Sequence, residues 1–348
     1  MSTAVPAVYR ELRLDAIRRE AKEKGCVEGP GVRPAGSPMP LASPETGYYG
    51  YPLLKEPQWT PLIPPYFFVG GAAGALGVIG ALADVVGDDA DLARTARWMA
   101  LGGAALSGTL LIVDLGRPSR FLNMLRVFKP QSAMSMGSWV LTAFSASAGL
   151  ASFSDALRYF LGPGDLERIA GIVGRTGSAL FGMPFHNYTG VLIGATAIPV
   201  WNSHIRALPR EFGMSGLQSA VSILELAGYE SRTSLNLLGL LSSGMETAEL
   251  ARELPSNKPA NKPLRSGSSG ALVMAAAVLS GPLPFALRIA SAFAGKERGR
   301  KLRRAAAWSG VLGSLCLRYG WVKAGAQSAR DWRLPLQIPS PEEQANGS

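Results

Sequence analysis

The sequence predicts an all-α integral membrane protein with about eight transmembrane helices, because of the spacing of its charges and the length of its apolar segments. Four segments contain no Asp, Glu, Lys or Arg: Pro65–Ala83, Gln131–Ser154, Thr176–Ser203 and Ser266–Leu287. Each is close to the roughly 20 residues that a helix needs to cross a hydrocarbon core. The mean hydropathy of +0.14 is low for such a protein. We attribute it to a polar N-terminal extension and basic loops, with a soluble protein of buried core helices as the alternative.

The first helix is predicted at 65–84. Pro64 and Pro65 suit its beginning, because proline is tolerated in the first turn of a helix. The run from Gly70 to Gly77 then places small residues at helical spacing. Such spacing lets two helix backbones approach closely within lipid, so it predicts a packed bundle.

The other helices follow the remaining apolar runs. We predict them near 96–114, 135–154, 188–206, 211–228, 232–252, 268–294 and 305–326. Between the third and fourth helices, Asp165–Gly182 combines apolar with charged residues at helical spacing. This pattern favours an amphipathic helix lying in the membrane interface.

Eight spans would put both termini on one side of the membrane, together with the 115–134 loop. Lys and Arg favour this side, although Lys296–Arg304 is strongly basic on the other. The positive-inside rule therefore favours cytoplasmic termini of a multi-pass protein in the plasma or inner membrane. We divide the chain into a polar, partly disordered extension (1–47), a transmembrane domain (48–331) and a C-terminal tail (332–348).

The cysteines and histidines limit the cofactors that this chain could hold. Cys26 and Cys316 are isolated, so the chain contains no cysteine framework for zinc or an iron–sulfur cluster. His186 and His204 are the only histidines. If they flank one helix, they lie roughly 27 Å apart and cannot be opposite axial ligands of one heme. We therefore expect no heme, metal or iron–sulfur cluster here, and an electron carrier borrowed from a partner.

The segment Asp114–Pro130 joins two long uncharged stretches and is both basic and apolar. Its positive residues are Arg117, Arg120, Arg126 and Lys129, and its apolar residues include Phe121, Met124, Leu125 and Phe128. Lipid headgroups would need the charge but little else. Arginine combined with aromatic anchors is typical of a protein interface, so we predict that this loop docks a partner protein.

Several motifs resemble the NrfD-like membrane subunits of polysulfide reductases and related quinone-linked oxidoreductases. They are Tyr48–Trp59, Ile63–Gly71, Asp114–Pro130, Met134–Trp139, Tyr188–Leu192 and Ala197–Trp201. The resemblance implies two packed four-helix bundles. It also implies a ferredoxin-like iron–sulfur subunit and a molybdopterin oxidoreductase subunit as partners, alongside membrane lipids and without nucleic acid.

A quinone site needs hydrogen-bond donors, a proton acceptor and an apolar slot. Tyr66, Asp114, Asn202 and His204 could supply the polar groups at one membrane interface, with Trp201 as a wall against the ring. The resemblance places the pocket for menaquinone or ubiquinone at the partner-facing end of the first four helices, on Tyr66 and Asp114. Alternatively, Asp114 pairs with Arg117 or Arg120, the aromatic residues are interfacial anchors and His204 is a solvated loop residue.

Ionisable residues inside membrane helices are functional candidates because they are costly to bury. Glu225, Glu246 and Arg318 could form a proton path, or a structural Glu–Arg pair. We therefore predict a quinone- or quinol-interacting membrane subunit of a multi-subunit oxidoreductase, of the polysulfide reductase or formate dehydrogenase type, with no catalysis of its own outside the complex. The alternatives are a passive membrane anchor of such a complex and a polytopic transporter.

Overall fold

The computed structural model describes residues 53–86, 89–253 and 259–331, with Leu334, Pro335 and the isolated positions Ala16, Arg19 and Glu23. The predicted extension (1–47) and most of the predicted tail (332–348) lie outside these residues. The described α-helices are α2 (Ile63–Val86), α3 (Ala90–Asp114), α4 (Ala133–Leu161), α5 (Asp165–Gly194), α6 (Pro199–Asn202), α7 (Leu208–Leu224), α8 (Thr233–Glu253), α9 (Lys262–Arg265), α10 (Gly267–Ser280), α11 (Pro282–Phe293) and α12 (Lys296–Arg330).

Three further helical segments of the described residues are not α-helical. They are the 3₁₀ helices η1 (Pro118–Leu125) and η3 (Pro259–Asn261) and the π-helical turn η2 (Glu225–Tyr229), which continues α7. Gly228 within η2 has φ 112°, a conformation that favours glycine because other residues would place a Cβ too close to the backbone. The π turn ends α7 at this point.

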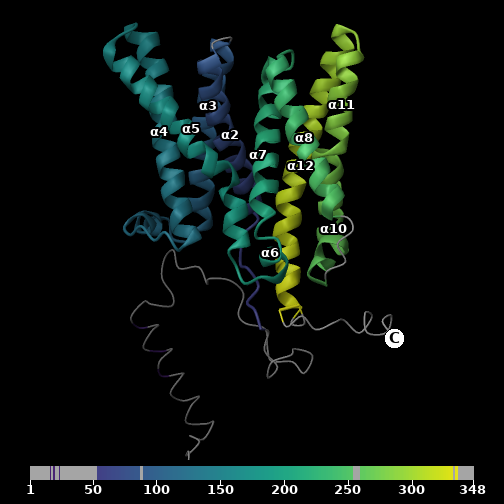
Figure 1. Cartoon of the computed structure of the whole chain (residues 1–348). Coiled ribbons are helices and arrows are strands. Elements are labelled where there is room, and N and C mark those ends of the chain that lie inside the picture. Colours follow the sequence, from purple (N-terminus) through teal and green to yellow (C-terminus); the bar gives the residue numbers. More distant parts are fainter. Residues whose placement is uncertain are drawn as a thin grey trace, which may run out of the picture.

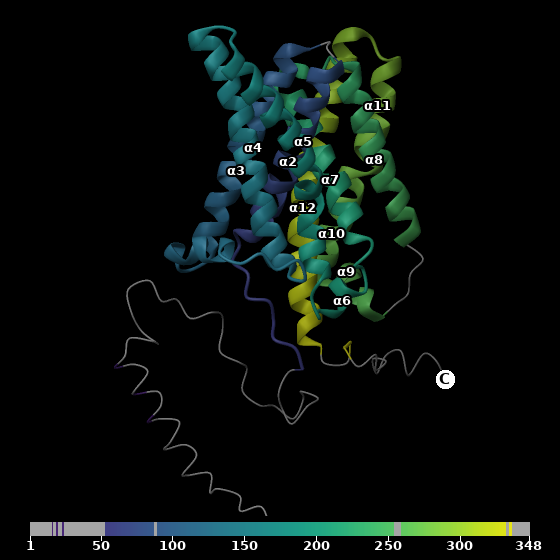
Figure 2. The same cartoon turned by 60° about the vertical axis from the view of Figure 1, so that its left-hand side comes forward.

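The long helices lie side by side and the chain reverses direction between them (Figure 1). The short helix α6 and the end of α12 lie at one end of the bundle, which we call the α6 end. The α4–α5 and α11–α12 connections lie at the other, which we call the far end; a second view shows the same arrangement (Figure 2). Among the described residues, four helical segments are long and apolar enough to cross a membrane: α2, α3, α4 and the combined α10–α11 segment.

The helices pack in two groups that share one interface. Helices α2, α3, α4 and α5 contact one another and form what we call the first half. Helices α7, α8, α10, α11 and α12 contact one another and form the second half. The halves meet where α7 contacts α2 and α5, and where α12 contacts α2.

Two predicted helices are wrong. The structure has neither an interfacial helix at 165–182 nor a separate span at 188–206, because α5 runs continuously through Asp165–Gly194 with Pro184 inside it. Glycines let α5 pack tightly along its whole length. A Cβ at Gly174 would overlap the backbone of Ala151 in α4, and one at Gly182 would lie 2.6 Å from the carbonyl oxygen of Gly74 in α2. This close packing offsets the free-energy cost of the backbone hydrogen bond that Pro184 cannot donate.

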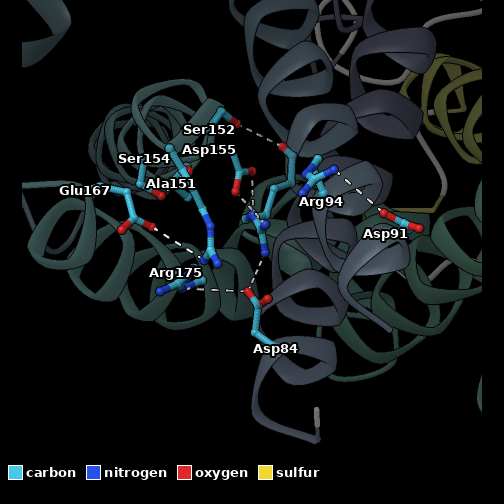
Figure 3. A network of polar contacts seen from close by, with 11 residues as sticks. Asp84, Asp91, Arg94, Ala151, Ser152, Ser154, Asp155, Glu167 and Arg175 are labelled. Carbon is cyan, nitrogen blue, oxygen red and sulfur yellow. Dashed lines mark hydrogen bonds and ion pairs between the residues drawn. The ribbon is translucent and has the colours of Figure 1, made fainter. Parts of the chain in front are cut away.

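An arginine holds the first half together at the far end. Arg97 of α3 is 6% exposed. It donates two hydrogen bonds to Asp155 of α4, at 2.7 and 2.9 Å, and forms an ion pair with Asp84 of α2. Arg175 of α5 approaches Asp84 at 3.7 Å, so the network joins all four helices (Figure 3). Bidentate arginine–carboxylate pairs are strong and directional, which fixes how these helix ends sit together.

Candidate functional site

A cluster of aromatic side chains fills the α6 end where the two halves meet. Trp201 is fully buried and its ring stacks on Trp59, with centroids 4.9 Å apart. Trp59 also contacts Phe67 edge-on at 5.7 Å, and Phe67 contacts Phe212 of α7. The segment that leads into α2 is therefore held against both halves.

Three predicted site residues, Trp201, Asn202 and His204, take part in local hydrogen bonds. The Trp201 indole Nε1 donates to the carbonyl oxygen of Trp321 in α12 at 2.8 Å. Asn202 is exposed, and its side chain donates to the carbonyl oxygen of Thr196 at 3.1 Å. His204 is buried, with its Nδ1 2.8 Å from the Val200 carbonyl oxygen and its ring edge-on to Trp321. In this structure His204 is not a solvated loop residue.

The other two predicted residues, Tyr66 and Asp114, lie in the first half at the same end. Tyr66 is in the first turns of α2 and is buried. The Asp114 carboxylate, half-buried at the end of α3, accepts a hydrogen bond from the Thr60 hydroxyl just before α2. Within the described part of the chain Asp114 forms no ion pair with Arg117 or Arg120. Thr60 therefore links the acid to the segment that carries Tyr66.

Tyr188 lies at a different end from the one that follows from the predicted helix at 188–206, which would begin at Tyr188 on the side opposite the 115–134 loop. Because α5 begins at Asp165, Tyr188 lies near the end of the helix, at the α6 end. Its hydroxyl donates to the Ala133 carbonyl oxygen at 2.6 Å, and Tyr66 is close enough to interact with it electrostatically. Its ring lies against Gly137 of α4, where a Cβ would overlap it. The Tyr-Thr-Gly motif made Tyr188 visible in the sequence. The position of Tyr188 along the helix depended on where the helix begins.

The predicted docking loop forms η1 beside the start of α4. Three apolar side chains of this loop, Leu122, Val127 and Phe128, are each more than half exposed. Phe128 contacts Trp139 of α4 edge-on at 5.9 Å, and Phe121 is half-buried. The predicted basic residues Arg120, Arg126 and Lys129 are exposed and Arg117 is half-buried. The loop therefore presents positive charge and apolar surface together, at the same end as Asp114 and Tyr188.

A cavity of about 120 Å³ lies in the second half, away from these tyrosines. Its walls come from α7, α8, α10 and α12 and include the acids Glu211 and Glu246 and the ring of Trp321. The Glu246 Oε1 atom is shielded from solvent and has no hydrogen-bond partner among the described residues. Trp321 Nε1 donates to Glu211 at 3.2 Å. This cavity is not where the sequence predicted a quinone pocket.

The fold separates one residue of the predicted proton path, Glu225, from the other two, since Glu246 and Arg318 are neighbours. Glu225 pairs with Arg288 of α11 through two contacts of 2.6 and 2.7 Å, and both side chains are fully buried. Arg318, also fully buried, forms no ion pair with a described carboxylate. It donates instead to Ser215 and to the Phe212 carbonyl oxygen, and its guanidinium lies 4.7 Å from the Phe212 ring centroid.

The predicted placement of the histidines also needs correction. His186 lies inside α5, and the chain then leaves the helix at Gly194 before it reaches His204. The helical distance between them therefore does not apply. Among the described residues no three or more His, Cys, Asp or Glu side chains gather as they would around a metal ion. Cys316 is a half-buried free thiol, and Cys26 lies outside the described residues.

The family model described as "Polysulphide reductase, NrfD" matches residues 55–234 of the chain. The matched region begins before Trp59 and ends just after η2. It therefore contains the whole first half, the η1 loop, α6 and α7. No curated protein matches the chain.

Proposed function

The chain belongs to the polysulphide reductase NrfD family of helical transmembrane subunits, and we propose that it is the quinone- or quinol-interacting member of a multi-subunit oxidoreductase. The family match carries this proposal, because it spans the tyrosines, Asp114 and the η1 loop. In this proposal the chain exchanges electrons with a separate iron–sulfur subunit, and a molybdopterin subunit completes the complex.

We propose eight membrane spans in two four-helix bundles. The four long apolar segments supply four spans. The others are α5, α7 with η2, α8 and α12, each of at least 21 residues. At about 1.5 Å per residue such helices reach roughly 30 Å, the thickness of a hydrocarbon core. Arg97, the buried far-end arginine, is paired with two carboxylates, which limits its cost in lipid.

We place the quinone site at the α6 end of the first half, between Tyr66, Tyr188 and Asp114. The Tyr66 hydroxyl is a hydrogen-bond donor, the Tyr188 hydroxyl can accept a hydrogen bond while it donates to Ala133, and the Asp114 carboxylate can accept a proton. Leu110 and Leu111 of α3 pack against the aromatic cluster and make the surroundings of Asp114 apolar. Gly137 leaves room for the Tyr188 ring. Together, the polar groups and the apolar side chains are of the kinds that a quinone head group needs. A bound quinone would supply two-electron, two-proton redox chemistry.

Each residue has a distinct role in this proposal. Tyr66 orients the ring by a hydrogen bond from its hydroxyl, and the Tyr188 hydroxyl, whose proton goes to Ala133, accepts one from a quinol. The Thr60 hydroxyl holds the Asp114 carboxylate in position. Asp114 exchanges protons with water at the membrane surface, which its partial exposure permits. Trp201, Asn202 and His204 support the site from α6 by holding the aromatic cluster together, rather than by touching the ring.

We propose that the iron–sulfur subunit docks on the η1 loop. Its exposed Phe128 and Leu122 are apolar anchors, while Arg120, Arg126 and Lys129 would meet acidic groups of the partner. Since the loop follows Asp114 directly, a partner bound there would bring a cluster close to the quinone site. A passive anchor would dock the same partner without using quinone.

Asp114→Asn tests the quinone site. The amide keeps the size of the side chain and its bond to Thr60 but cannot take up a proton, so the complex should assemble and lose most of its quinone-linked turnover. Asp91→Asn is the matched control, since Asp91 is an exposed acid at the other end of the same helix. Equal turnover of wild type and Asp114→Asn across a pH series would remove the proton-handling role and favour the passive anchor.

Phe121→Ala combined with Phe128→Ala tests the docking loop. The double variant should insert into membranes but release the soluble partner, which co-purification at moderate salt measures. Phe153→Ala with Phe160→Ala removes two exposed aromatic side chains from α4 towards the far end and should retain the partner. If the η1 double variant retains all of the partner, the loop is better explained as a membrane-surface segment.

A further inference from the structure

A stripe of polar side chains runs along one buried face of α7. Glu211, Ser215, Gln218, Ser222 and Glu225 follow one another at intervals of four and three residues, which keeps them on one side of a helix. The last four are fully buried. From Glu211 to Glu225 the stripe extends about 21 Å at 1.5 Å per residue, most of the thickness of a hydrocarbon core.

Neighbouring helices add hydrogen-bonded side chains to this stripe, and we call the whole set the column. Ser314 of α12 donates to the Ser215 carbonyl oxygen at 2.9 Å, and Ser219 donates to Ser314 at 2.7 Å. Arg318, one turn along α12, donates to Ser215. On the other side of α7, Ser242 of α8 donates to the Gln218 side-chain oxygen. Two hydrogen-bonded groups therefore lie along the stripe, one around Ser215 and Ser314 and one around Gln218 and Ser242.

Two polar atoms in the centre of the column have no partner within the described residues. They are Gln218 Nε2 and Ser222 Oγ. Both face Gly310 of α12, since a Cβ there would lie 2.6 Å from the first and 2.7 Å from the second. An unsatisfied buried polar group costs about 1–3 kcal/mol, so such groups usually bind water. A column built only for packing would have used apolar side chains here.

Carboxylates lie at both ends of the column. At the α6 end, Glu246 of α8 has Arg318, Glu211 and Ser280 as its polar neighbours and borders the cavity. Towards the far end, Glu225 is paired with Arg288 and lies near Arg303 and Glu230. Glu230 in turn lies 3.9 Å from the half-exposed Arg300. Each end therefore leads from a buried acid towards a less buried charged group.

The helices are irregular next to both acids. Beside Glu225, α7 changes to the π turn η2. Beside Glu246, the chain breaks between α10 and α11 at Gly281, whose φ and ψ are −98° and −102°. A Cβ at Gly281 would lie 3.1 Å from the side-chain oxygen of Thr247, the residue after Glu246. Such irregular backbone in membrane helices is common at functional sites and ion pathways.

We propose that this column conducts protons through the second half, between Glu246 at the cavity and Glu225 towards the far end. A proton taken up by the Glu246 carboxylate passes along the serine hydroxyls, Gln218 and bound water, and leaves through Glu225 towards Glu230; no bond other than those to the moving proton changes. The buried guanidinium groups of Arg318 and Arg288 disfavour metal cations, whereas protons move by exchanging hydrogen bonds.

The test uses the purified full-length chain in liposomes that contain a pH-sensitive dye. A potassium diffusion potential set by valinomycin drives protons inwards, and the rate of internal acidification is measured without quinone. Wild type should acidify faster than protein-free liposomes and equally fast when choline replaces sodium. Ser222→Ala should lower the protein-dependent rate roughly tenfold, equivalent to about 1.4 kcal/mol in the barrier.

Ser178→Ala is the matched control, because Ser178 is also a buried serine without a partner among the described residues, but lies on α5 outside the column. It should leave the rate unchanged. Gln218→Leu should abolish the flux, and size-exclusion profiles will show whether each variant is folded; Ser222→Ala removes only one unpartnered hydroxyl and should fold normally. A wild-type rate equal to that of empty liposomes, or equal rates for Ser222→Ala and wild type, would overturn the proposal. Because no quinone is present, this result is independent of the quinone site.

Discussion

Arg97 of the first half and Arg318 of the second half are buried in opposite ways. In the first half, Arg97 lies at the far end and binds Asp84 and Asp155 directly. In the second half, Arg318 lies deep inside and binds hydroxyls, a carbonyl oxygen and an aromatic face. In the first arrangement the carboxylates pair with the arginine and hold the helices together. The second leaves Glu246 available for proton exchange, which is why we assign a structural role to the first network and a functional one to the second.

The largest effect should come from breaking the Glu225–Arg288 ion pair, which is fully buried in the second half. Arg288→Met leaves the Glu225 carboxylate without its partner in a fully buried site. Removing one partner of a buried pair costs about 3–5 kcal/mol, and replacing both partners by apolar groups costs much less. Unfolding in mixed detergent micelles should therefore show a large loss for Arg288→Met, with much of it recovered in Glu225→Leu/Arg288→Met. A double variant no more stable than the single one would mean that Glu225 is not held only by Arg288.

Arg97→Met should have a smaller effect, although Arg97 makes more contacts with acids. Asp84 and Asp155 keep some exposure, 24% and 12% of their side chains, and Arg175 remains beside Asp84. We expect a loss of about 1.5–3 kcal/mol, the usual contribution of hydrogen bonds to charged groups. The same unfolding assay measures it. The rate of proton flux should not change, and a fall as large as that of Ser222→Ala would contradict the division of roles.

Two glycines of α4 sharpen the comparison within the first half. Gly137→Ala places a methyl group where the Tyr188 ring lies, so it should displace the ring and cost about 1–3 kcal/mol by overpacking. Gly149→Ala, in the same helix, meets only Leu101 at 4.0 Å and should be neutral or stabilise by up to about 1 kcal/mol. Quinone-linked turnover should fall only in Gly137→Ala. Equal turnover in both would argue against a role for the position of Tyr188.

The sequence predicted the all-helical class and the surface loops better than the interior. The η1 loop could be predicted because its mixture of Arg and Phe is local. The continuity of α5 past Pro184 could not be predicted, because it depends on the contacts of the α5 glycines with α2 and α4. The predicted helix at 188–206 would also have put Tyr188 at the far end, and not at the α6 end where it lies.

Long-range partners were also beyond the sequence. Glu225 and Arg288 are 63 residues apart, and Asp114 and Thr60 are 54 apart, so only the packing of the helices brings them together. The polar stripe on α7 was visible as a spacing of four and three residues. Only its Glu225 was predicted to be functional, because serine and glutamine occur on many helix faces and only burial distinguishes this one.

The most direct test of the central claim is to map a photoreactive quinone analogue on the purified full-length chain. After irradiation, mass spectrometry identifies the labelled peptides, and excess unlabelled quinone shows which labels are specific. Our account predicts competed labels on the segments of α2, α3 and α5 that carry Tyr66, Asp114 and Tyr188. Competed labels confined to α8 and α10, around the Glu246 cavity, would contradict it and move the quinone site to the second half.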